Sequence, residues 1–316
     1  MRTVINIFIL LLASAILAGP TTSAASGGTN AMTIKSILAT KERIKPLFTR
    51  MGKPLPGDWL ESHEEHGQTF EEYVRSSPTR PGGKRKVLYI QPIGDFTEKQ
   101  ISIVRLASEF MSKYFQLSTV VLPGLPLSVI PKSAQRTHPT WGDRQVLTGY
   151  VLDRVLKPRL PEDAAAYIAF TACDLWPGEG WNFVFGQASL RDRVAVWSIY
   201  RNGNADGGPE DFRVCLLRTM KTATHETGHM FGMQHCIEYE CNMCGSNNRE
   251  EADRRPIQLC PECAAKVWWT TGADPLARYA ELALFCEQQM LKSEQECYQR
   301  LISRLRPAEH TVLQGG

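Results

Sequence analysis

The chain has 316 residues, and its 36 lysines and arginines against 33 aspartates and glutamates give a formal net charge of +3. A balance this close to neutral gives no electrostatic reason to expect binding to nucleic acid or to a membrane surface. The length suffices for one large domain or two modest ones, with enough apolar material for a buried core.

The first residues predict a secretory signal peptide, residues 1–24. Arg2 precedes an almost unbroken apolar stretch from Val4 to Leu17, and small residues follow it up to Ala24. A charged start, a short apolar run and a small-residue end are typical of such a leader. We therefore expect a secreted or periplasmic protein without stable membrane association after cleavage. The alternative is an uncleaved leader that anchors the chain in a membrane, although the apolar run is short for a membrane-spanning helix.

Residues 25–85 read as an N-terminal segment and linker, and alternating strands and helices follow. Thr97 and Gln100 have the spacing of a capping box at the start of a helix. The hydrophobic periodicity predicts strands at 87–90, 118–122 and 167–172, and helices at 97–117 and 145–156.

Two further strands, 183–188 and 194–200, follow without an intervening helix, which predicts antiparallel pairing near a sheet edge. We expect Val194–Tyr200 to be an exposed edge to which an extended peptide adds as a further strand. The alternative is that the N-terminal segment covers this edge.

A helix predicted at 211–231 carries the most informative motif of the chain. Residues 225–235 read His-Glu-Thr-Gly-His-Met-Phe-Gly-Met-Gln-His, a complete H-E-x-x-H-x-x-G-x-x-H run. His225 and His229 stand one helical turn apart and project from the same face, so both rings can reach one metal ion.

The second half of the motif predicts a third ligand. Gly232 permits a positive φ with which the backbone can leave the helix and bring His235 back toward the metal. Three imidazoles on zinc leave a fourth position for water, as in catalytic rather than structural sites. Glu226 offers a carboxylate that can take a proton from that water.

The histidine motif and several other segments of the chain, taken in order, carry a resemblance to a known family. They read HETGHMFGMQHC, CNMCGSN, EEADRRP and CPEC, preceded by WLESHEEHGQTFEEY, TACDLWP and WNFVFGQASL. In these segments the sequence resembles the archaemetzincins, a branch of the metzincin zinc peptidases. The resemblance runs from about residue 59 to about residue 270, and the zinc motifs are its most specific part.

The resemblance implies a role for each motif residue. It implies that His225, His229 and His235 hold a catalytic Zn²⁺ and that Glu226 is the general base. Met243 would lie in the turn beneath the site without binding metal, the alternative being an ordinary core methionine. A second, structural Zn²⁺ would be held by four cysteines, whose thiolates form a closed tetrahedral site: Cys236, Cys241, Cys260 and Cys263.

The cysteines leave alternatives open. Cys244 competes with Cys241 for one of the four places, because the two form a C-x-x-C pair. An exported protein can also pair its cysteines as disulfides, although zinc bound during folding would protect them. In the helical tail, residues 274–306, Cys286 and Cys297 could form one disulfide.

The order of elements predicts an α+β fold with a twisted mixed β-sheet and the active-site helix below it. In metzincin terms this is a zincin-like upper catalytic subdomain, 86–232, followed by a smaller lower subdomain, 233–310, with the cysteine cluster, the Met-turn and C-terminal helices. Substrate is expected in the cleft between them.

The expected function is that of a zinc metallopeptidase that hydrolyses peptide bonds in a peptide or protein substrate. The resemblance admits aminopeptidase action, but the sequence singles out no acidic anchor for a substrate amine. The alternative is a catalytically silent, zinc-stabilised protein on the same fold that binds peptide or nucleic acid. Acidic residues interleave with the basic ones among the cysteines, so nucleic-acid binding is not expected.

Overall fold

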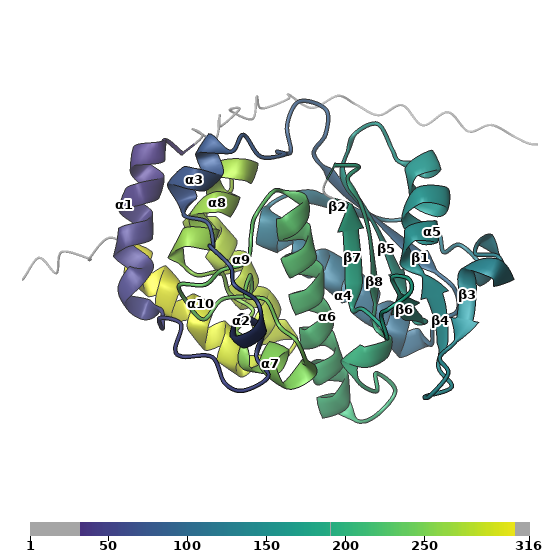
Figure 1. Ribbon diagram of the computed structural model, residues 1–316. Coiled ribbons are helices and arrows are strands. Elements are labelled where there is room, and N and C mark those ends of the chain that lie inside the picture. The colour runs from purple at the N-terminus through teal and green to yellow at the C-terminus, as the bar shows by residue number, and fades with distance from the viewer. Residues whose placement is uncertain (1–31, 190, 307–316) are drawn as a thin grey trace, which may run out of the picture. The chain divides into compact units, whose positions relative to one another are not determined.

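A five-stranded mixed sheet is the larger of the two sheets in the described part of the chain (Figure 1). The computed structural model describes residues 32–189 and 191–306, so the predicted leader lies outside the described residues. The strands are β1 (Val87–Ile93), β2 (Ser118–Val121), β5 (Ala164–Thr171), β7 (Gly186–Ser189) and β8 (Val194–Ser198). Their order is β2-β1-β5-β8-β7, and every pair is parallel except β7 with β8. The predicted mixed sheet is confirmed.

The edge of this sheet differs from the prediction. The antiparallel pairing of the last two strands is confirmed, but the edge strand is β7, because β8 lies between β5 and β7. The prediction that Val194–Tyr200 forms an exposed edge is therefore wrong. All five residues of β8 are buried, as an internal strand with both faces covered requires, whereas β7 is only half-buried.

The segment 145–156 was predicted as one helix and is only partly helical. Its first residues form β4 (Arg144–Leu147), which joins a second sheet with β3 (Gln135–Thr137) and β6 (Asp174–Trp176). The buried side chain of Gln145 donates hydrogen bonds to Asp174 Oδ2 at 2.7 Å and to the Asn182 carbonyl at 2.8 Å. These long-range contacts override the local helical pattern. The chain turns helical only at α5 (Thr148–Tyr150), which continues as a π-type turn, η4 (Val151–Leu156).

The predicted capping box is confirmed at the start of α4 (Glu98–Phe115). Thr97 Oγ1 accepts from the Gln100 backbone at 3.2 Å, and the Thr97 backbone donates to Gln100 Oε1 at 3.0 Å. Helix α4 packs against α6 (Pro209–Met230), the helix that carries the histidine motif, on one side of the sheet. The η4 turn and its neighbours cover the other side with a smaller apolar cluster.

The remaining helices gather around the segment that follows α6 (Figure 1). They are α1 (Ile34–Ile44), α2 (Trp59–Ser62), α3 (Phe70–Arg75), α7 (Arg249–Arg254), α8 (Pro261–Thr271), α9 (Pro275–Gln288) and α10 (Lys292–Leu305). Short 3₁₀ turns are η1 (Lys45–Leu47), η2 (Leu127–Val129), η3 (Lys132–Ala134), η5 (Lys157–Arg159) and η6 (Tyr200–Asn202).

The C-terminal helices pack on the core. Tyr279, Leu282, Phe285 and Leu301 are fully buried, and Met290, at the turn between α9 and α10, is exposed. The N-terminal residues are not merely a linker, because α1 packs on α8 and α10, and α3 packs on α8. Over the described ranges, none of the helices combines the length and the apolar character needed to cross a membrane.

Candidate metal centre and active site

Helix α6 begins with signals that fix its position and ends at the histidines. Pro209 occupies the first turn, and the Gly208 backbone donates to an oxygen of the Asp211 carboxylate at 2.9 Å. Further along, Thr224 and Thr227 donate their hydroxyls to backbone carbonyls one turn earlier, at 2.8 and 2.7 Å. These bonds let polar side chains sit in the buried face of the helix, so the opposite face is free to present the histidines.

Gly232 turns the chain back after α6. Its φ is +83°, the left-handed value expected from the sequence. Its backbone donates to the His229 carbonyl at 2.8 Å, and the Met233 backbone donates to the Gly228 carbonyl at 3.0 Å. A β-carbon at position 232 would lie 2.8 Å from the Pro78 Cβ, so both the backbone conformation and the packing require glycine here.

The structure brings the three motif histidines together. One ring nitrogen from each of His225, His229 and His235 lies within 4.8 Å of the others. The two Nε2 atoms of His225 and His229 are 2.9 Å apart. On the far side of the rings, His225 Nδ1 donates to the Asn242 carbonyl and His229 Nδ1 to the Met233 carbonyl, both at 2.7 Å.

The third histidine is oriented by a residue that the sequence did not single out. His235 Nδ1 donates to Glu65 Oε1 at 2.7 Å. Trp59 meets the same ring edge-on at a centroid distance of 5.3 Å, and it stacks on His63 at 3.7 Å. Glu65 and Trp59 lie in the segment WLESHEEHGQTFEEY, whose resemblance to archaemetzincins was the one available signal, since no local spacing links them to His235.

These contacts fit a bound zinc ion. Carbonyl and carboxylate oxygens only accept hydrogen bonds, so each Nδ1 carries a proton, and in a neutral ring Nε2 then presents a lone pair. The facing lone pairs of His225 and His229 repel one another unless a cation lies between them. Burial and the neighbouring histidines lower the pKa of His225 and of His235, which keeps both rings in the neutral form that binds metal.

Glu226 lies beside this group of nitrogens. It is half-buried and, with His225, lines a hollow next to the histidines. Burial raises the pKa of its carboxyl group. Its position follows from the helix, because it adjoins His225 in sequence.

Met243 lies beneath the histidine helix. Its side chain is fully buried, and its Sδ lies 2.6 Å from the position that a β-carbon on Gly228 would take. Gly228 falls between His225 and His229 in the helix, so the thioether packs directly under the histidines. The Met243 carbonyl accepts from the Cys236 backbone at 2.8 Å, which ties this turn to the segment just after His235.

Four cysteine sulfurs form a second group, and all four side chains are buried. They lie within 4.8 Å of one another and belong to Cys236, Cys241, Cys260 and Cys263. Backbone amides point at two of the sulfurs: Cys241 Sγ accepts from Cys260 at 3.2 Å, and Cys260 Sγ accepts from Cys263 at 3.5 Å. Such amides favour thiolates, and four thiolates in this arrangement match a closed tetrahedral zinc site.

The fifth cysteine of this region lies outside the group. Cys244 Sγ contacts the Tyr239 carbonyl at 3.2 Å and lines the hollow beside Glu226. All nine cysteines of the chain lie in the described ranges, and every one is a free thiol. The disulfide that the sequence allowed between Cys286 and Cys297 is therefore not formed; Cys297 Sγ instead accepts from Gln258 Nε2 at 2.8 Å.

Comparison with known proteins gives one consistent family. The model of Peptidase family M54 matches residues 166–268. Archaemetzincin-2 of Homo sapiens is 35% identical over 74% of this chain and 73% of its own length. Archaemetzincin of Archaeoglobus fulgidus is 33% identical over 57% of this chain and 98% of its own length. The crystal structure of archaemetzincin from Methanopyrus kandleri has 29% sequence identity and a TM-score of 0.46, covering 59% of this chain and 96% of that one.

The matched region contains the whole histidine motif, which ends at His235, and all four clustered cysteines. The human relative extends the similarity over about three quarters of both chains. The chain therefore belongs to the archaemetzincin family of zinc metallopeptidases.

Proposed function

We propose that Glu226 is the general base in the hydrolysis of a peptide bond, and that His225, His229 and His235 hold the catalytic zinc. The observation that carries the proposal is the convergence of three imidazole nitrogens, with the opposite nitrogen of each ring held by an oxygen acceptor. Each acceptor is satisfied by the Nδ1 proton, which leaves Nε2 of the neutral ring as the nitrogen that can bind metal.

Each residue of the proposed site has a separate role in the reaction. When bound, zinc supplies a Lewis acid that polarises the scissile carbonyl and acidifies water. Glu226 takes the proton of the attacking water and passes it to the leaving amine. The Asn242 and Met233 carbonyls and the Glu65 carboxylate hold the three rings in orientation, so the ligands need no rearrangement during turnover.

Cleavage of a mixed peptide library by the zinc-loaded protein, followed by mass spectrometry, tests this proposal. Glu226→Gln keeps the shape of the side chain but cannot accept the proton. We expect it to retain zinc while its turnover falls by about 10²-fold or more. The product ladder of the parent protein would also distinguish trimming of chain ends from internal cleavage.

Equal activity in Glu226→Gln would remove this residue from the mechanism. The absence of cleavage by the parent protein, with zinc shown to be bound, would instead favour a catalytically silent peptide-binding protein on the same fold. No observation in the structure favours nucleic acid as the ligand.

We further propose that Cys236, Cys241, Cys260 and Cys263 hold a second, structural zinc, so that the chain binds two zinc ions. The support is the geometry of four buried sulfurs with backbone amides directed at them. Met243 would act only by packing, because its Sδ lies under the helix at Gly228.

The apolar run after Arg2 supports a further proposal, that residues 1–24 direct export and are then removed. Expression of the full chain in a bacterial host should give a product in the periplasm or medium that begins at Ala25, as intact-mass measurement would show. Recovery of the uncleaved chain in the membrane fraction would favour the anchored alternative.

A further inference from the structure

A hollow of about 590 Å³, open solvent at its mouth included, adjoins Glu226 on the side away from His229 and His235. Its walls come from α6, from the loop after Met243, from α7 and from Phe185, the residue just before the edge strand β7. Because His225 and Glu226 form part of the lining, any group that fills the hollow lies next to the reacting bond.

Two cations in this lining, Lys221 and Arg249, form no ion pair with a carboxylate of the described residues. Lys221 Nζ donates only to the carbonyls of Ala252 and Asp253, at 3.2 and 3.1 Å. The Arg249 guanidinium donates to the Arg201 carbonyl at 3.3 Å and to Asn202 Oδ1 at 2.9 Å, and its centre lies 4.1 Å over the Phe185 ring. Arg249 Nε is buried and has no hydrogen-bond partner among the described residues.

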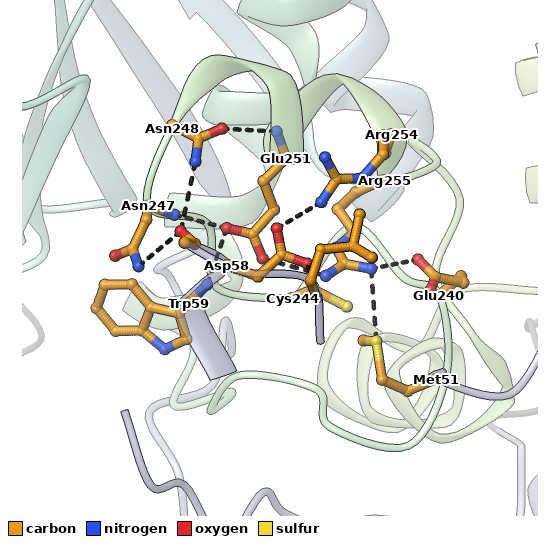
Figure 2. A network of polar contacts seen from close by, with 12 residues as sticks. Met51, Asp58, Trp59, Glu240, Cys244, Asn247, Asn248, Glu251, Arg254 and Arg255 are labelled. Carbon is orange, nitrogen blue, oxygen red and sulfur yellow. Dashed lines mark hydrogen bonds and ion pairs between the residues drawn. The ribbon is translucent and has the colours of Figure 1, made fainter. Parts of the chain in front are cut away.

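Two carboxylates outside the lining act on these cations: Asp253 raises the pKa of both, and Glu294 raises that of Lys221. Glu240 and Glu251 accept from Arg255, the third cation of the lining, at 2.5 and 3.1 Å (Figure 2). Asp253 forms an ion pair with Arg218 at 2.6 Å. Glu226 is the one acidic residue in the lining, and it lies at the end beside His225. The lining itself therefore carries more positive than negative charge, with Lys221, Arg249 and Arg255 against Glu226.

The positive charge has a cost in the free protein. Burial lowers the pKa of Lys221, and it lowers the pKa of Arg249 to about 10, with neighbouring Arg218 as a further cause for the arginine. A buried cation without an anionic partner is unfavourable, and a carboxylate placed between two such cations offsets that cost. An anion bound in the hollow would offset that cost.

We propose that this hollow binds a carboxylate of the peptide substrate, so that the enzyme prefers an aspartate or glutamate side chain beside the cleaved bond. The inference rests on the proposed function, because it takes His225 and Glu226 as the site of cleavage. A terminal carboxylate of the substrate has the same chemistry, and the experiment separates the two sources.

The test uses three sets of short alanine peptides. The first two sets are acetylated and amidated and carry either Glu or Gln at each position in turn. The third set carries Gln and has a free C-terminal carboxylate. For the zinc-loaded protein we expect one position at which Glu raises kcat/KM over Gln by about tenfold or more. A gain only in the free-acid set would assign the hollow to the terminal carboxylate. Equal rates in all three sets would overturn the proposal.

Two variants locate the preference in the hollow. Arg249→Gln and Lys221→Gln should each reduce the Glu-over-Gln ratio toward one, chiefly by slowing the Glu peptide. Arg213→Gln is the matched control. It removes a positive charge from α6, the helix of Lys221, at a position outside the hollow, and it should leave the ratio unchanged. A ratio that persists in both Arg249→Gln and Lys221→Gln would overturn the assignment.

A binding measurement separates this proposal from the proposed function. Fluorescence anisotropy of the same labelled peptides with zinc-loaded Glu226→Gln requires no turnover. Tighter binding of the carboxylate peptides would support the hollow even if the parent protein cleaved nothing. Equal binding of Glu, Gln and free-acid peptides would contradict it even if the parent protein proved to be an active peptidase.

Discussion

Glu65 and His235 are 170 positions apart in the chain, yet the carboxylate of the first fixes the ring of the second at 2.7 Å. An acidic acceptor behind a ligand histidine increases the basicity of the nitrogen that faces the metal. Backbone carbonyls hold the other two histidines, so Glu65 is the acceptor of this site that a side-chain substitution can remove.

Glu65→Ala should weaken zinc binding by about 10- to 100-fold, because His235 loses the acceptor that orients it. Competition with a chromophoric chelator would measure the affinity. Glu64→Ala removes the same charge from an exposed neighbouring position and should leave zinc affinity unchanged. Parent-like affinity in Glu65→Ala would show that the ring is held in place by packing against Trp59 alone.

At this scale the sequence predicts what is local. The positions of His225, Glu226 and His229 follow from helical spacing. Gly232 predicts the turn that brings His235 back toward the other two histidines. Glu65, Lys221 and Arg249 carry no such signal, since each acquires its role only from partners brought close by the fold. The sulfur of Cys241 lies within 4.8 Å of those of Cys236, Cys260 and Cys263, and this proximity favours Cys241 over Cys244, between which spacing alone does not decide.

The cysteine group joins two elements that the chain separates. Cys236 and Cys241 lie in the loop beneath the histidines, whereas Cys260 caps the N-terminus of α8 and Cys263 lies in its first turn. A metal held by these sulfurs would therefore clamp α8 to the Met243 turn. Structural zinc contributes on the order of 10 kcal/mol to the folding of small domains, so its loss should lower the free energy of unfolding.

Native mass spectrometry can count the zinc ions. We expect two in the parent protein, one in Cys263→Ser and two in Cys244→Ser, together with a lower melting temperature for Cys263→Ser alone. Two zinc ions in Cys263→Ser would contradict the assignment, and loss of one in Cys244→Ser would bring Cys244 into the ligand set.

Elements were predictable where their own residues decide the conformation. The Thr97–Gln100 box and the apolar periodicity define α4, and the burial of β5 and β8 follows from their apolar composition. The prediction failed at 145–156, where the pairing of Gln145 with Asp174 draws the first residues into a strand. It also failed in choosing the edge strand, because a hairpin does not specify which of its strands pairs inward.

For the whole molecule, a buried carboxylate holds the N-terminal segment in place (Figure 2). Glu251 is fully buried, and its oxygens accept from the Trp59 backbone at 3.0 Å, from the Asn247 backbone at 2.8 Å and from Arg255 at 3.1 Å. Asp58, next to Trp59, pairs with Arg254 at 2.5 Å. These contacts dock the segment that contributes Glu65 and Trp59 onto α7.

Glu251→Ala should destabilise the fold by about 3 kcal/mol, because Arg255 loses one of its two carboxylate partners and the amides of Trp59 and Asn247 lose their buried acceptor. Limited proteolysis should then cut the segment 49–69 faster than in the parent protein. Glu250→Ala, at an exposed position of the same helix, should change stability by less than about 0.5 kcal/mol. Unchanged cleavage rates in Glu251→Ala would show that other contacts suffice to dock the segment.

The anchoring of residues 58–70 has a consequence for the order in which a newly made chain folds. Glu251 and Glu262 bind the backbone amides of Trp59 and Phe70, and both are synthesised after His235. A chain that ended before these anchors would already contain the three histidines and Glu226, but the segment with Glu65 would be docked only by contacts such as those of Gln68 with Gly232 and Gln234. The segment that carries Glu65 is thus fully docked only when the helices that bear Glu251 and Glu262 have folded back on it.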